Sequence, residues 1–166
     1  MKNSKRLLIA MDNSEASQRA VDYVSVMIDG RSGYYVCVLH AIEPVPPFEH
    51  AGAEDPRQEA ILDARLQKKD AEWLEREKQA AQPRLEKAKS ELLRAQVSED
   101  AIATRFAPAA NVDGLVTEIL AAAEKERCDA IVVGRETFTG LDRIFRRHVA
   151  DDLIRRAHGY TIWIVE

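Results

Sequence analysis

The sequence is poor in cysteine and has no long apolar run. Its 166 residues include two cysteines, Cys37 and Cys128. They lack the spacing of a metal-ligand motif and stand beside predicted strands, so we interpret them as buried free thiols. Every apolar run is far shorter than the roughly 20 residues that a membrane-spanning helix needs. The sequence therefore indicates neither a metal centre nor a membrane protein.

Positive charge is also in short supply. Acidic residues number 28 against 24 Lys and Arg, which gives a formal net charge of −4. This balance argues against general affinity for nucleic acid, which requires a basic surface. A signal peptide is not indicated, because only five apolar residues, LLIAM, follow Arg6 before Asp12 interrupts them. We therefore expect a cytoplasmic protein with neither nucleic acid nor a membrane as a partner.

The remaining composition is that of a soluble globular protein, with 46% hydrophobic and 31% charged residues. Short apolar runs alternate with helical patterns, which predicts an α/β fold with a doubly wound parallel sheet in one domain, residues 1–166. The predicted strands are Arg6–Met11, Tyr34–Ile42, Ala101–Ala107, Ala130–Val133 and Thr161–Val165. The predicted helices are Glu15 to about Ile28, a long insertion at about 57–95, a helix ending near Arg127, and one around Val149–Ala157.

The long helical region is rich in Ala, Glu, Lys, Leu, Gln and Arg, which are strong helix formers. Pro83 interrupts it, and a proline inside a helix costs on the order of 3 kcal/mol. We expect a kink or break there that separates two helices, with Gln82 outside the α region. The first part is longer than one crossover needs, so we expect it to project or to cover a partner.

Two stretches resemble the universal stress protein family. One is KRLLIAMDNSEAS near the N-terminus, which matches a first strand that ends on an aspartate, here Asp12. The other is DAIVVGRETFTGLDRIFRRHVADDLIRRAHGYTIWIVE, from Asp129 to Glu166. The match extends over nearly the whole chain. It implies a Rossmann-like fold of the adenine nucleotide alpha hydrolase type, with five parallel strands in the order 3-2-1-4-5.

In such a sheet, ligands bind outside the carboxyl ends of the strands where the strand order reverses. That point lies between the first and fourth strands, which places Asp12 and Gly134 in one crevice. The resemblance implies that Asp12 lies near the ribose of a bound nucleotide, ATP or AMP, and that the backbone of Ala41 meets the adenine. Asp12 is equally suited to cap the helix that follows it, and both roles can hold.

The loop after the fourth strand departs from the family pattern. Nucleotide-binding members carry Gly-x2-Gly-x9-Gly-Ser/Thr, and on this sequence the four positions are Gly134, Thr137, Arg147 and His148. A phosphate cradle needs backbone N–H groups at close range with no Cβ in the way. The departures therefore predict a degenerate phosphate loop that binds ATP weakly or not at all.

Basic residues in the same loop support an alternative. Arg135, Arg147 and His148 crowd it, together with Arg143 and Arg146, in an otherwise acidic chain. Arginine binds phosphate in a bidentate manner, so the alternative is a stress protein that binds, and slowly hydrolyses, an adenine nucleotide or holds another anion. Arg155 and Arg156 are accounted for by Asp151 and Asp152, four residues earlier. No set of residues indicates catalysis.

The final strand ends the sheet on a run of large apolar residues, Ile162, Trp163, Ile164 and Val165. An unpaired apolar edge is an aggregation hazard, and pairing with the same strand of a second subunit removes it. The resemblance implies the same pairing. We therefore expect a homodimeric stress-response module of regulatory type.

Overall fold

The computed structural model describes residues 5–42, 56–109, 112–135 and 144–166. Its strands form one parallel sheet in the order β3-β2-β1-β4-β5, which confirms the predicted fold class and strand order. The strands are β1 (Lys5–Met11), β2 (Tyr34–Ile42), β3 (Ile102–Pro108), β4 (Ala130–Gly134) and β5 (Thr161–Val165). The helices are α1 (Glu15–Ile28), α2 (Pro56–Arg94), α3 (Val112–Lys125) and α4 (Ile144–Arg156), with a short 3-10 turn, η1 (Glu99–Ala101).

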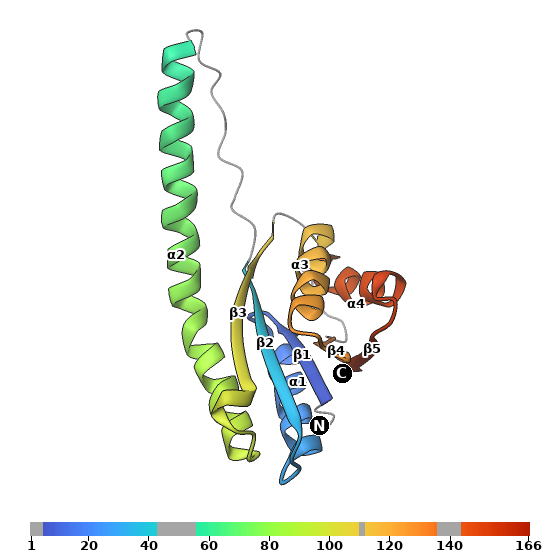
Figure 1. Cartoon of the computed structure of the whole chain (residues 1–166). Coiled ribbons are helices and arrows are strands. Elements are labelled where there is room, and N and C mark those ends of the chain that lie inside the picture. The colour runs from blue at the N-terminus through green and yellow to red at the C-terminus, as the bar shows by residue number, and fades with distance from the viewer. Residues whose placement is uncertain (1–4, 43–55, 110–111, 136–143) are drawn as a thin grey trace.

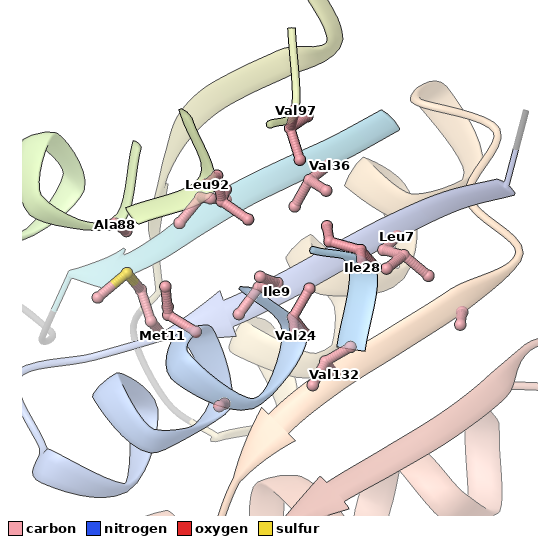
Figure 2. Close-up of a cluster of buried hydrophobic side chains, with 14 of the residues drawn as sticks. Leu7, Ile9, Met11, Val24, Ile28, Val36, Ala88, Leu92, Val97 and Val132 are labelled. Carbon is pink, nitrogen blue, oxygen red and sulfur yellow. The ribbon is translucent and has the colours of Figure 1, made fainter. Parts of the chain in front are cut away.

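Helices cover both faces of the sheet, because successive side chains of a strand point to opposite faces. Leu7 and Ile9 of β1 belong to a core under α1 and the C-terminal half of α2, which also contains Val24 and Leu92 (Figure 2). Leu8 of β1 belongs to the other core, under α3 and α4. The three central strands are thus buried on both faces, as their continuous apolar runs predict.

The register of the central strands decides which chain segments meet at the carboxyl edge of the sheet. β1 lies between β2 and β4, with Met11 opposite His40 and Ala10 opposite Val133. The residues that follow β1 and end β4, Asp12 and Gly134, therefore reach the same edge of the sheet. The predicted neighbourhood of the two residues is confirmed, although 122 positions separate them in the sequence.

The expected break into two helices at Pro83 is wrong, whereas a kink within one helix, the other outcome that the sequence allows, stays a prediction. α2 is one continuous helix of 39 residues with Pro83 inside it, and Gln82 is helical. Pro83 and Gln79, whose carbonyl would accept the missing bond, are both exposed, so water can solvate that carbonyl. Ala81, Leu85, Ala88 and Leu92 are buried on both sides of the proline. Complete burial of one leucine stabilises by about 1.5–3 kcal/mol, so the burial of Leu85 and Leu92 together is enough to offset the cost of the ring.

Candidate functional site

A compact hydrogen-bonded turn links β1 to α1 at the carboxyl edge of the sheet. Asp12 Oδ1 accepts hydrogen bonds from the Ser14 backbone N–H at 2.8 Å and from Ser17 Oγ at 2.7 Å. The Asp12 N–H donates to Ser17 Oγ at 2.9 Å. Ser14 is the N-cap of α1, and its Oγ accepts from the Ser17 N–H at 3.2 Å. The Asp12 carboxylate therefore has a local structural role in the turn before α1, while Ser14 caps the helix itself.

Gly134 ends β4 directly against the first turn of α1. A Cβ on Gly134 would lie 2.1 Å from the carbonyl oxygen of Ala16 and 2.7 Å from the backbone nitrogen of Ser17. Real Cβ atoms do not approach backbone this closely. The glycine is needed at this position because the helix backbone occupies the space of a side chain.

Ala41 and Arg135 lie on either side of this turn. Ala41 is a partly exposed residue near the end of β2 and pairs with Ala107 of β3. Arg135 follows β4, and its N–H donates to the carbonyl of Val165 at 2.7 Å. Its guanidinium approaches Glu166, with Nη1 3.8 Å from Oε1. Arg135 is thus joined to the end of β5 by both its backbone and its side chain.

The sequence predicts three further residues in the phosphate loop: Thr137, Arg147 and His148. Arg147 and His148 belong to α4. This helix begins at Ile144, earlier than the helical pattern around Val149–Ala157 predicts. The side chains of Arg147 and His148 lie outside the described part of the chain, as does Thr137 altogether. The structure therefore brings together Asp12, Ala41 and Gly134 at one edge and leaves the phosphate-loop side chains as predictions.

His40 is buried next to this edge. It is 1% exposed, and within the described chain neither ring nitrogen has a hydrogen-bond partner. The ring packs against Phe106 with an interplanar angle of 63°. Burial lowers the pKa of His40, which keeps the imidazole neutral near pH 7. Two unsatisfied nitrogens in a buried side chain lower the stability of the folded state. His40 directly precedes Ala41, so this cost falls next to the carboxyl edge of the sheet.

A second polar cluster, which sequence reasoning missed, lies near the opposite, amino edge of the sheet. The buried carboxylate of Glu126, in the turn between α3 and β4, accepts a hydrogen bond from Tyr35 Oη at 2.6 Å. Arg105 Nε donates to Glu126 Oε1 at 2.7 Å. Arg6 Nε donates to the Glu126 carbonyl at 2.5 Å, and its guanidinium carbon lies 3.6 Å from the centre of the Tyr35 ring. We call these four residues the Glu126 cluster.

The Glu126 cluster changes the titration of its members. The hydrogen bond from Tyr35 is the largest cause that lowers the pKa of Glu126, with help from Arg105. Burial, together with the same carboxylate, raises the pKa of Tyr35 to about 12. The Cys37 thiol on the same side of the sheet has a pKa raised to about 12, first by burial. The cluster is a satisfied, charged network, and a thiol beside it is not poised to react.

The basic residues of α4 pair differently from the expected i,i+4 pattern. Arg156 reaches α3, where Nη1 lies 2.6 Å from Asp113 Oδ1 and Nη2 donates to Thr117 Oγ1 at 2.8 Å. Arg155 lies 3.9 Å from Asp152, three residues earlier. The expected pairing of Asp152 with Arg156 is therefore replaced by a bridge between two helices. This bridge joins the last two helices on the same face of the sheet.

Two other kinds of feature are absent from the described ranges. No helix there is long and apolar enough to cross a membrane. In the same part of the chain, no group of three or more His, Cys, Asp or Glu side chains is arranged to hold a metal ion.

Comparison with known proteins identifies the family. The model of the universal stress protein family matches residues 3–162. A solved family member from Burkholderia pseudomallei is 18% identical, with 99% of this chain and 98% of that chain covered and a TM-score of 0.64. Universal stress protein UspA from Lactobacillus plantarum is 15% identical, with 99% of each chain covered and a TM-score of 0.58. A search of curated protein sequences found no significant match. The chain belongs to the universal stress protein family.

Proposed function

We propose that this protein is a dimeric stress-response module of regulatory type whose carboxyl-edge crevice does not serve as the family's ATP site. Family membership supports the general role in stress response. The observation that carries the finer proposal is the contact between Gly134 and the backbone of Ala16. It gives the first glycine of the family motif a packing role here, so the presence of that glycine is not evidence for a phosphate cradle.

The neighbouring polar groups support the same proposal. Asp12 Oδ1 accepts from Ser14 and Ser17 within its own turn. The alternative, nucleotide binding through arginines, needs guanidinium groups aimed at the crevice. The guanidinium of Arg135 approaches Glu166 at the end of β5, which leaves that alternative to Arg147 and its neighbours. Within the described chain, Arg135 therefore gives no support to nucleotide binding through arginines.

The dimer proposal rests on the outer edge of β5. Thr161 donates its N–H to Asp129, and the Val165 carbonyl accepts from Arg135, so the backbones of both residues point towards β4. Because backbone groups alternate along a strand, those of Ile162 and Ile164 point outwards. Ile162, Trp163, Ile164 and Val165 are all only partly buried. If β5 of a second subunit runs antiparallel along this edge with the two Trp163 residues opposite each other, Ile162 of each subunit pairs with Ile164 of the other.

Native mass spectrometry of the purified protein tests both parts in one experiment. We expect a dimer mass, twice 18.7 kDa, with no added mass of ATP or AMP. A species that retains an adenine nucleotide would contradict the proposal for the crevice. A monomer mass at every concentration would contradict the proposal for β5. The two parts can therefore fail separately.

A further inference from the structure

The N-terminal half of α2 projects beyond the sheet and the other helices (Figure 1). Its 39 residues span about 58 Å at 1.5 Å per residue. The buried residues of the helix, Ala81, Leu85, Ala88 and Leu92, all lie in its C-terminal half. Between residues 57 and 80, no side chain that the structure describes is buried. Most helical stability in proteins comes from packing of one face, so we expect this half of α2 to pack against a partner.

One face of the projecting half has a regular spacing. Leu66, Asp70, Trp73 and Glu77 follow one another at intervals of four, three and four residues, which places them on one side of the helix. Each is partly buried, whereas most residues between them are exposed. We call these four residues the α2 stripe. Its centre is Trp73, one of two tryptophans in the chain, and a large aromatic side chain is a typical interface anchor.

Both acidic residues of the α2 stripe meet basic residues when the helix is laid against a reversed copy of itself. Residues 57–80 contain six basic and six acidic side chains, so this half carries no net charge. Reversal about Trp73 places Asp70 opposite Arg76, since each is three residues away from the tryptophan. The same reversal places Leu66 opposite Ala80 and Glu77 opposite Lys69. A parallel arrangement would instead bring Asp70 against Asp70, which is repulsive.

We propose that the α2 stripe docks on the same stripe of a second copy of this chain, in antiparallel orientation, with Trp73 at the two-fold axis. The occupant is a second copy because, in the antiparallel register, Asp70 and Glu77 each lie opposite a basic residue of the same helix in the other subunit. This contact is independent of the β5 edge, since α2 packs on β2 and β3 and β5 lies at the other side of the sheet. If both two-fold contacts form, the protein assembles beyond the dimer.

Charge reversal and restoration test the register. All variants carry Ile164→Pro, so that β5 pairing does not contribute to the measured association. We expect Asp70→Arg to raise the dimer dissociation constant at least tenfold in sedimentation equilibrium, and Asp70→Arg with Arg76→Asp to restore it. The matched control is Glu75→Arg, which makes the same charge change on the opposite side of the helix and should leave association unchanged. A protein that is monomeric at 100 μM before the charge changes, or a double variant as weak as Asp70→Arg, would overturn the proposal.

Cross-linking tests the orientation. Asp70→Cys and Arg76→Cys proteins are mixed and treated with a short bismaleimide, while Cys37 and Cys128 are buried and give little background. The antiparallel register predicts that the linked product is mainly the mixed pair. Preferential linking of Asp70→Cys to itself would show a parallel arrangement, and the absence of any linked product would show that the stripes do not meet. Either result contradicts the proposal.

Discussion

Gly134 and Ala16 lie in direct backbone contact, so closely that a methyl group on Gly134 would come within 2.1 Å of the Ala16 oxygen. The contact joins the end of β4 to the first turn of α1 at the carboxyl edge of the sheet. This packing explains the presence of a glycine that the family motif would assign to phosphate binding.

Gly134→Ala should therefore destabilise the fold irrespective of any ligand. The added carbon has to displace helix backbone, and overpacking of this kind costs about 1–3 kcal/mol. Urea unfolding monitored by circular dichroism measures the difference. An unfolding free energy within 0.5 kcal/mol of the wild type, a margin typical of surface substitutions, would show that the contact is not constraining.

Glu126→Gln should weaken the fold by about 2 kcal/mol, since hydrogen bonds to a charged group contribute about 1.5–3 kcal/mol. Because the pKa of Glu126 is lowered in the folded state, its stabilisation is complete above the unfolded value near 4.3 and is lost as pH falls through the folded value. The difference between wild type and variant should thus be constant above about pH 5 and shrink below about pH 4. Glu118→Gln, an exposed change on the preceding helix, is the control, and equal effects of the two substitutions would contradict this account.

His40→Leu should make the free energy of unfolding less dependent on pH below about pH 6.5. The pKa of His40 is lowered by burial, the Ala41 backbone and Asp12 favour the charged form, Arg84 disfavours it, and the unfolded value is near 6.5. Below about pH 6.5 the unfolded chain takes up a proton that the folded chain does not, so stability falls by up to about 1.4 kcal/mol per pH unit until the folded pKa is reached. Unfolding series from pH 7 to pH 5 should show a shallower slope for His40→Leu than for wild type or the exposed-site control His158→Leu. Parallel slopes for all three proteins would refute the role of His40.

Ile164→Pro should weaken the dimer and leave the pairing of β4 with β5 in place. The N–H of Ile164 points away from β4, so the ring removes a donor from the open edge only. Ile164→Ala removes the side chain but keeps the donor, and it should still dimerise. Light scattering across a dilution series distinguishes the two variants, and equal dimerisation of both would contradict pairing through this edge.

The strands and helices could be predicted because apolar runs and turns are local signals, whereas the strand order and the meeting of Asp12 with Gly134 are implied by the family resemblance. The Glu126 cluster could not be predicted, since Glu126 meets Tyr35 across 91 positions and Arg6 across 120. No local pattern marks a glutamate that follows a helix as the centre of a network. Arg156 shows the same limitation, because its partner Asp113 lies 43 residues away on another helix.

Pro83 illustrates how tertiary packing overrides a local signal. The penalty of a proline ring is correctly expected from the sequence, but the burial of Leu85 and Leu92 against the sheet is not visible there. Likewise, the family motif gives Gly134 a role in phosphate binding, whereas its packing against the Ala16 backbone is not visible in the sequence.

Calorimetric titration of the protein with ATP tests the central claim most directly. We expect a dissociation constant weaker than about 10 μM, which corresponds to roughly −7 kcal/mol. The companion variant Thr137→Gly/Arg147→Gly/His148→Ser restores the family loop and should bind more tightly than the wild type if the loop is the obstacle. Wild-type binding tighter than 10 μM would contradict the account, and its loss in Arg147→Ala would show that arginine has taken over the role of the missing glycines.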